Sequence, residues 1–137
     1  PPDSASAGWM IVIDSSAILA LLFDEPGAEL VKPALPMGLM SAVNYAEVLS
    51  RFERDKQGSS ISIALSLRRA VQEVVPFDFE QAAYAAIVMM QTKQYGLSLG
   101  DRCCLALAKV RNCAVLTADR VWLKPSLHPH VEIKCIR

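Results

Sequence analysis

The sequence has no excess of charge of either sign. Its 137 residues include 14 Lys and Arg and 14 Asp and Glu, so the formal net charge is zero. A protein without an overall basic field can contact nucleic acid only through local patches. Apolar runs are also short, and none reaches the roughly 18 residues that a membrane span needs. We therefore expect no membrane association.

Metal sites built on cysteine and histidine are not expected either. The chain has four cysteines but no C-x-x-C pair, and its only histidines, His128 and His130, come late. This spacing argues against a zinc site. The first nine residues lack the features of a secretory signal. We interpret the cysteines as reduced, small apolar residues of a cytoplasmic protein.

Few glycines and few tryptophans exclude further types of site. No glycine-rich fingerprint follows the first predicted strand, which excludes phosphate-loop and dinucleotide sites. Paired carboxylates could serve glycoside hydrolysis. However, carbohydrate sites need stacking aromatic side chains, and Trp9 and Trp122 are the only tryptophans.

Apolar residues are abundant, at 53% of the chain, and they predict one domain with a large core at residues 10–137. Residues 1–9 are interpreted as an extension or a cloning remnant. Strands are predicted at 10–13, 38–42, 74–78, 113–117 and 131–136. Helices are predicted at 16–23, 27–32, 44–57, 61–74, 79–94, 101–112 and 120–123.

This alternation of strands and helices predicts an α/β fold. A mainly parallel sheet of four to five strands should lie between helices on both faces, as a three-layer α/β/α sandwich. Pro76 cannot donate to a ladder, which predicts an edge position for strand 74–78. Alternating apolar and polar residues predict that strand 131–136 is an outer strand.

Several local interpretations accompany these elements. Ser15 or Ser16 is expected to cap the helix after the first strand, and Asn44 the helix after the second. Asp78 is expected to cap the helix at 79–94. The adjacent Met89 and Met90 of that helix are interpreted as core filling.

Four acids follow a pattern that the topology can bring together. Asp14 ends the first strand, Glu47 lies in the helix after the second, and Asp119 follows the fourth. The carboxyl ends of parallel strands and the starts of the following helices share one edge of the sheet. Asp101 opens the helix that leads into the fourth strand and is less constrained.

Such carboxylates would repel one another, and a hard divalent cation, Mg²⁺ or Mn²⁺, would relieve the repulsion. A structural alternative exists for two of them. Asp14 alone could be an N-cap, and an isolated Glu47 could simply complement the helix dipole.

The motifs resemble those of PIN domains, and in particular VapC toxins of bacterial VapBC toxin–antitoxin pairs. The resemblance runs from Met10 to the C-terminus. It rests on the stretches DSSA at 14–17, NYAEV at 44–48, LSLGDR at 97–102 and LTAD at 116–119. Each stretch is weak by itself, but four in order are specific.

The resemblance implies a PIN-like fold and a metal-dependent endoribonuclease with an acidic site of Asp14, Glu47, Asp101 and Asp119. It also implies Mg²⁺ or Mn²⁺, an RNA substrate, a homodimer, and a cognate VapB-like antitoxin whose tail covers the site. Two hydroxyl residues, Ser16 and Thr117, match positions near the site and are expected to support it.

Arg102 and Arg120 flank the acids in sequence and are candidates for RNA phosphate contacts, with surface ion pairing as the alternative. Two other functions stay open. One is a PIN-like module that binds RNA or protein without cleavage. The other is a PIN nuclease that acts on DNA or in RNA processing rather than as a toxin.

Overall fold

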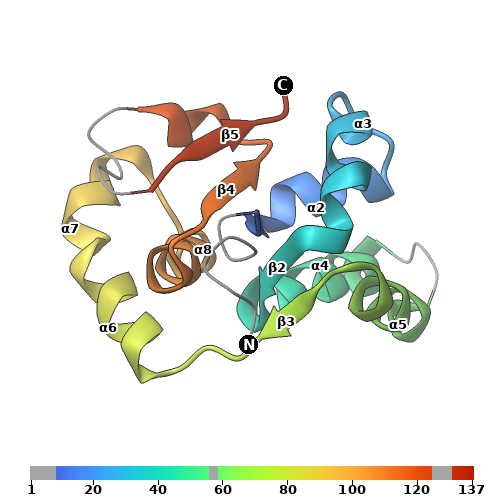
Figure 1. Cartoon of the computed structure of the whole chain (residues 1–137), viewed down its shortest axis with the longest axis horizontal. Coiled ribbons are helices and arrows are strands. Elements are labelled where there is room, and N and C mark those ends of the chain that lie inside the picture. Colours follow the sequence, from blue (N-terminus) through green and yellow to red (C-terminus); the bar gives the residue numbers. More distant parts are fainter. Residues whose placement is uncertain (1–8, 56–58, 125–130) are drawn as a thin grey trace.

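The computed structural model describes residues 9–55, 59–124 and 131–137, and a five-stranded sheet lies at its centre (Figure 1). The strands are β1 (Ile11–Ile13), β2 (Gly38–Ser41), β3 (Glu73–Val75), β4 (Ala114–Thr117) and β5 (Ile133–Cys135). Their order is β3-β2-β1-β4-β5, and every neighbouring pair is parallel. The predicted parallel sheet and the edge positions of the third and fifth strands are confirmed.

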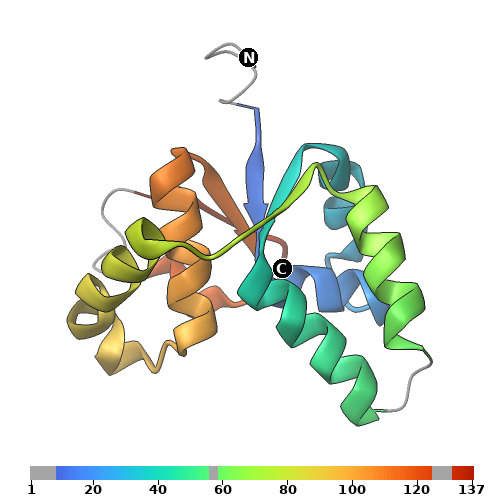
Figure 2. The ribbon, with the colours of Figure 1, turned by 90° about the horizontal axis from the view of Figure 1, so that it is seen from below.

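Helices cover both faces of the sheet, which confirms the three-layer sandwich. The α-helices are α2 (Ser15–Leu22), α3 (Ala28–Val31), α4 (Ala42–Asp55), α5 (Ser60–Ala70), α6 (Phe79–Ile87), α7 (Met89–Thr92) and α8 (Leu99–Arg111). The 3₁₀ helices are η1 (Lys32–Met37), η2 (Lys93–Tyr95) and η3 (Arg120–Leu123). Figure 2 shows α6 and α8 on one side of the sheet and α4 and α5 on the other.

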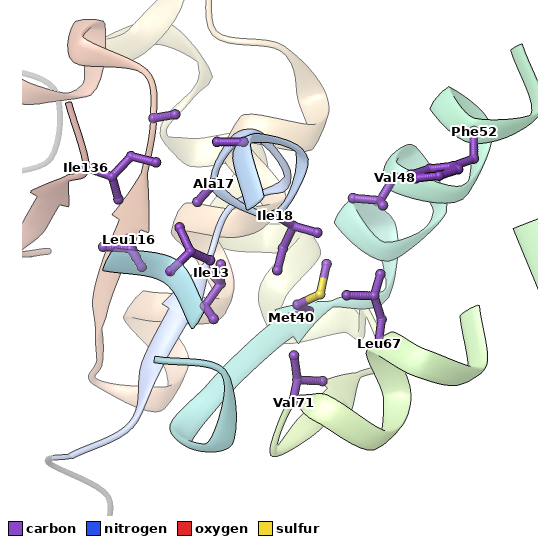
Figure 3. Packing of buried hydrophobic residues seen from close by; sticks show 13 residues of the cluster. Ile13, Ala17, Ile18, Met40, Val48, Phe52, Leu67, Val71, Leu116 and Ile136 are labelled. Carbon is purple, nitrogen blue, oxygen red and sulfur yellow. The ribbon is translucent and has the colours of Figure 1, made fainter. Parts of the chain in front are cut away.

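Consecutive residues of the three central strands face opposite layers, because side chains alternate along a strand. One set packs with α8. The other packs with α2, α4 and α5 (Figure 3). The first set is Val12, Leu39 and Val115, and the second is Ile13, Met40 and Leu116. Burial on both faces explains the uninterrupted apolar runs of these strands.

The structure corrects several local predictions. The helix predicted at 79–94 is divided into α6, α7 and η2. Met89 and Met90 are 46% and 70% exposed, so their interpretation as core filling is wrong. Asn44 is not a cap, because α4 begins at Ala42 and the hydroxyl of Ser41 accepts a hydrogen bond from the Val43 amide.

Other predictions fall outside the described residues. These are the extension at 1–9 apart from Trp9, the last two residues of the helix predicted at 44–57, and both histidines. Within the ranges that the structure describes, no helix is long and apolar enough to cross a membrane.

Gly27 allows the start of α3 to pack closely against the backbone of Ile136. It is the N-cap of α3 and has a φ of 92°, in the left-handed region. A Cβ atom at this position would lie 2.5 Å from the carbonyl oxygen of Ile136. Gly96 also has a positive φ of 71°, but a Cβ there would meet nothing within 4 Å.

These two glycines give a matched test of the fold. Gly96→Ala should lower the free energy of unfolding by about 1 kcal/mol, the cost of a left-handed alanine. Gly27→Ala should lower it by about 2 kcal/mol or more, because its Cβ also collides with backbone. Urea denaturation measures both. Equal losses would show that the contact with Ile136 is not a constraint.

Candidate active site

The four predicted acids lie around the carboxyl ends of β1, β2 and β4. Asp14 directly follows β1, and Asp119 comes two residues after β4. Glu47 lies in α4, which follows β2 without an intervening loop, and Asp101 lies in the first turn of α8. The parallel pairing of β1 with β4 brings Asp14 and Thr117 to the same level of the sheet.

Asp14 is buried, with only 2% of its surface exposed. It occupies the N-cap position of α2, but its side chain makes no capping hydrogen bond. Instead, its Oδ2 accepts hydrogen bonds from Ser16 Oγ at 2.6 Å and Thr117 Oγ1 at 3.0 Å. Neither the capping role of Asp14 nor the predicted capping by Ser15 or Ser16 is therefore present.

Ser16 and Thr117 link Asp14, which follows β1, to the segment after β4 that leads to Asp119. Ser16 Oγ accepts a hydrogen bond from the Ala118 amide, and Thr117 Oγ1 accepts one from the Asp119 amide. Their hydroxyl oxygens are 3.1 Å apart. Both side chains thus orient Asp14 and hold the segment that leads to Asp119.

Glu47 is held by two polar neighbours. Its Oε1 accepts hydrogen bonds from Asn44 Nδ2 at 2.8 Å and from Ser15 Oγ at 3.2 Å. Asn44 is fully buried and also donates to the carbonyl oxygen of Gly100 at 3.0 Å. A Cβ on Gly100 would collide with the carboxylate group of Glu47, so the glycine makes room for this carboxylate.

Asp101 shares a capping box with Ser98, the N-cap of α8. Its Oδ2 accepts a hydrogen bond from the Ser98 amide at 2.9 Å, and Ser98 Oγ accepts one from the Asp101 amide at 3.1 Å. Asp119 is the N-cap of η3, and its Oδ1 accepts a hydrogen bond from the Val121 amide. Both acids are thereby oriented by local backbone.

Two of the four carboxyl groups, Asp14 and Asp101, have a raised pKa. Burial raises the pKa of Asp14 to about 6, and the charge of Asp101 adds to the increase, while hydrogen bonds from Ser16 and Thr117 oppose it. Burial also raises the pKa of Asp101, with further contributions from Glu47 and Asp119. Asp101 therefore interacts electrostatically with all three other acids.

No described Lys or Arg forms an ion pair with these four carboxylates. The two candidate phosphate ligands point elsewhere. Arg102 donates to the carbonyl oxygen of Ala85 at 2.8 Å, and Arg120 donates to that of Arg137 at 2.8 Å. Their phosphate contacts stay predictions that would require these bonds to break.

The donor set fits a hard divalent cation in its chemistry. Each carboxylate uses one oxygen in hydrogen bonds to described residues and leaves the other without one, and Asp14 Oδ1 is buried in that state. Oxygen ligands of this kind suit Mg²⁺ or Mn²⁺. Within the described ranges, however, no group of three or more His, Cys, Asp or Glu side chains is already arranged to hold an ion.

Three residues that orient these acids, Ser15, Asn44 and Ser98, were missed by sequence reasoning. Asn44 lies three residues before Glu47 on one helix, a spacing that places both on one face. Ser98 precedes Asp101 by three residues, which is the spacing of a capping box. Both signals were present in the sequence, although the burial of Asn44 depends on its distant contact with Gly100.

Comparison with known proteins identifies the family. The PIN domain family matches residues 11–126 of this sequence. This chain belongs to the PIN domain family. The family prediction made from the four motifs is confirmed.

The relatives and the solved structures agree with this assignment. Ribonuclease VapC of Mycolicibacterium smegmatis is 36% identical over 108 residues, which cover 73% of this chain and 84% of the relative. Ribonuclease VapC42 of Mycobacterium tuberculosis is 34% identical over 112 residues, which cover 73% and 83%. FitAcB from Neisseria gonorrhoeae has the same PIN fold, with 21% identity, a TM-score of 0.71, and coverage of 93% of this chain and 98% of that chain.

A structure of DNA-bound VapBC from Salmonella typhimurium has the same fold. It is 12% identical, with a TM-score of 0.69, and the match covers 93% of this chain and 98% of that chain. At these identities the two structures support the fold, whereas the sequence relatives support the family.

The burial of Asp14 predicts a pH dependence of stability in the presence of EDTA. Its folded pKa of about 6 is higher than the unfolded value of 3.8. The folded state therefore binds the extra proton between pH 4 and pH 6, and stability should fall as pH rises through this interval by up to about 3 kcal/mol. Above pH 6 this contribution should be constant.

Asp14→Asn removes the titrating group and should flatten this part of the profile. Urea unfolding of both proteins from pH 4 to pH 8 measures the difference. Parallel profiles for the wild type and Asp14→Asn would contradict the raised pKa.

Proposed function

We propose that this protein is an endoribonuclease that hydrolyses RNA phosphodiester bonds with Mg²⁺ or Mn²⁺, and that it acts as the toxin of a toxin–antitoxin pair. Asp14, Glu47, Asp101 and Asp119 would hold the cation. Membership of the PIN domain family and the VapC ribonucleases among the relatives support the reaction class.

One observation carries the proposal for the site. Asp14 Oδ1 is buried without a hydrogen-bond partner, at a place where three further acids lie without a compensating arginine or lysine among the described residues. An unpaired buried oxygen and mutual repulsion are costly to a fold. A bound cation would pair with the buried oxygen and attract all four carboxylates, so that both costs would be offset. This is the expected property of a metal site.

The chain's own residues orient these donors. Ser16 and Thr117 fix Asp14 through Oδ2, so that Oδ1 is the oxygen available to a ligand. Asn44 and Ser15 fix Glu47 in the same way through Oε1. The chemistry that a divalent cation supplies at such a site is activation of water and stabilisation of charge on a phosphodiester transition state.

The proposed partners follow from the relatives and from the surface. Several similar structures are VapBC complexes, which supports a VapB-like antitoxin as partner. Phe79, Ile87 and Met90 are 95%, 66% and 70% exposed on α6 and α7, and exposed large apolar side chains support a homodimer. Four free cysteines support a cytoplasmic location.

Asp14→Asn and Asp101→Asn should each lower Mg²⁺-dependent cleavage of single-stranded RNA by about 100-fold or more, because each removes a charged oxygen ligand. EDTA should abolish cleavage by the wild type. Gel assays of end-labelled RNA with purified proteins measure both effects. Asp78→Asn is the matched control, since Asp78 caps α6 outside the site and asparagine caps equally well.

Cleavage that persists in both site variants would contradict the catalytic assignment. Wild-type protein that binds RNA but never cleaves it, with either metal, would favour the binding module instead.

Gly100→Ala tests the position of Glu47. The new Cβ would displace the Glu47 carboxylate, the flexible end of an exposed side chain, so folding should be retained. Alanine also favours the helix by up to about 1 kcal/mol. We expect cleavage to fall by about tenfold or more with an unchanged or higher melting temperature. Full activity would show that Glu47 is not required where it lies.

A further inference from the structure

A surface groove begins at the acidic site and runs along α2 and α4. It has a volume of about 690 Å³. Ser15 and Glu47 line one end, next to the other acids. Arg51 and Arg54 lie further along α4 and also line the groove, and Leu19, Val43 and Ala46 supply apolar lining. The groove therefore joins the candidate catalytic acids to a pair of arginines.

The arginines share a helix face with Glu47. They lie four and seven residues beyond it, a spacing that places all three on one side of α4. Along the helix axis they are about 6 Å and about 10 Å from Glu47. Because α4 is one continuous helix, these separations are fixed.

The two guanidinium groups are oriented by one acid. Arg51 Nε and Arg54 Nε donate to the two oxygens of Asp55 at 2.5 Å and 3.0 Å. Arg51 also lies over the ring of Phe23, 5.3 Å from its centroid. The Nη groups of both arginines form no hydrogen bond with a described residue, so they can bind an anion.

We propose that single-stranded RNA crosses the groove between α2 and α4 as it leaves the acidic site, with Arg51 and Arg54 binding its phosphates. This inference rests on the proposed function. Two arginines with one shared aspartate leave a positive charge that complements a phosphate backbone. Leu19, Val43 and Ala46 add apolar surface to the groove, against which the faces of bases can pack.

The positive charge of Arg51 and Arg54 also favours RNA over a basic peptide as the occupant of the groove. The acidic site by itself attracts cations and repels phosphate. A strand that reaches it needs positive groups nearby, and Arg102 and Arg120 are both bonded to backbone carbonyls elsewhere. Arg51 and Arg54 line the same groove as Glu47, which is one of the four acids.

Arg54→Ala is the principal test, because this side chain is 70% exposed and its loss should not unfold the protein. Binding of a short, fluorescein-labelled single-stranded RNA is measured in EDTA over a range of salt concentrations. Loss of one phosphate contact should reduce the slope of log K against log salt by about 0.7. A roughly fourfold rise in salt should then weaken the wild type about 2.6-fold more than the variant.

Two further variants sharpen the result. Arg68→Ala on α5 makes the same charge change on an exposed arginine outside the groove and should keep the wild-type slope. Arg54→Lys should restore most of the slope, since lysine also contacts phosphate. Circular dichroism establishes that each variant is folded.

Equal slopes for Arg54→Ala and Arg68→Ala would overturn the groove assignment while leaving wild-type cleavage, and hence the proposed function, intact. Wild-type protein that neither binds nor cleaves RNA would instead reject the proposed function and this inference together. If Arg54→Ala lost a co-expressed antitoxin but kept the RNA slope, the groove would be a protein-docking surface and the proposal would be wrong.

Discussion

The site depends on a buried carboxylate at the end of the central strand. Removing the charge of Asp14 from water is costly, and two hydroxyl groups offset part of that cost. They come from different elements, Ser16 in α2 and Thr117 in β4, so the same hydrogen bonds tie the two strands together at the edge where the acids lie. Only one oxygen of Asp14 is satisfied in this way. The unsatisfied oxygen makes this place suitable for a cation and unfavourable for the fold without one.

The surrounding acids add to the cost of this site, because their like charges repel one another. Asp101 interacts electrostatically with Asp14, Glu47 and Asp119. Hydrogen bonds orient each of these carboxylates where it lies. The first turn of α8 offsets some of the repulsion, since helix N-termini favour negative charge. Burial of apolar residues on both faces of the sheet stabilises the fold and offsets the cost of this repulsion. The buried strands therefore have a role beyond packing, because their carboxyl ends position groups of like charge that interact electrostatically.

Sequence reasoning predicted the parts of this arrangement that topology determines. Apolar runs gave the parallel strands, and the ends of those strands gave the edge at which Asp14, Glu47 and Asp119 lie. It failed where side-chain direction depends on tertiary contacts. Asn44 was interpreted as a cap, yet it bonds to Gly100, which is 56 residues away. Arg102 follows Asp101 directly, yet consecutive residues on a helix point in different directions, and Arg102 donates to the carbonyl oxygen of Ala85 on α6. Its contact with phosphate stays a prediction.

A net charge of zero does not conflict with a nucleic-acid substrate, because the charges are separated in space. Negative groups gather at the carboxyl edge of the sheet, where a divalent cation would neutralise part of the local charge. Arg51 and Arg54 follow on the same helix as Glu47, four and seven residues beyond it. A single rigid helix thus fixes how far the positive groups lie from the negative site. Local patches of this kind can guide a phosphate backbone without the general attraction to nucleic acid that an overall basic protein would have.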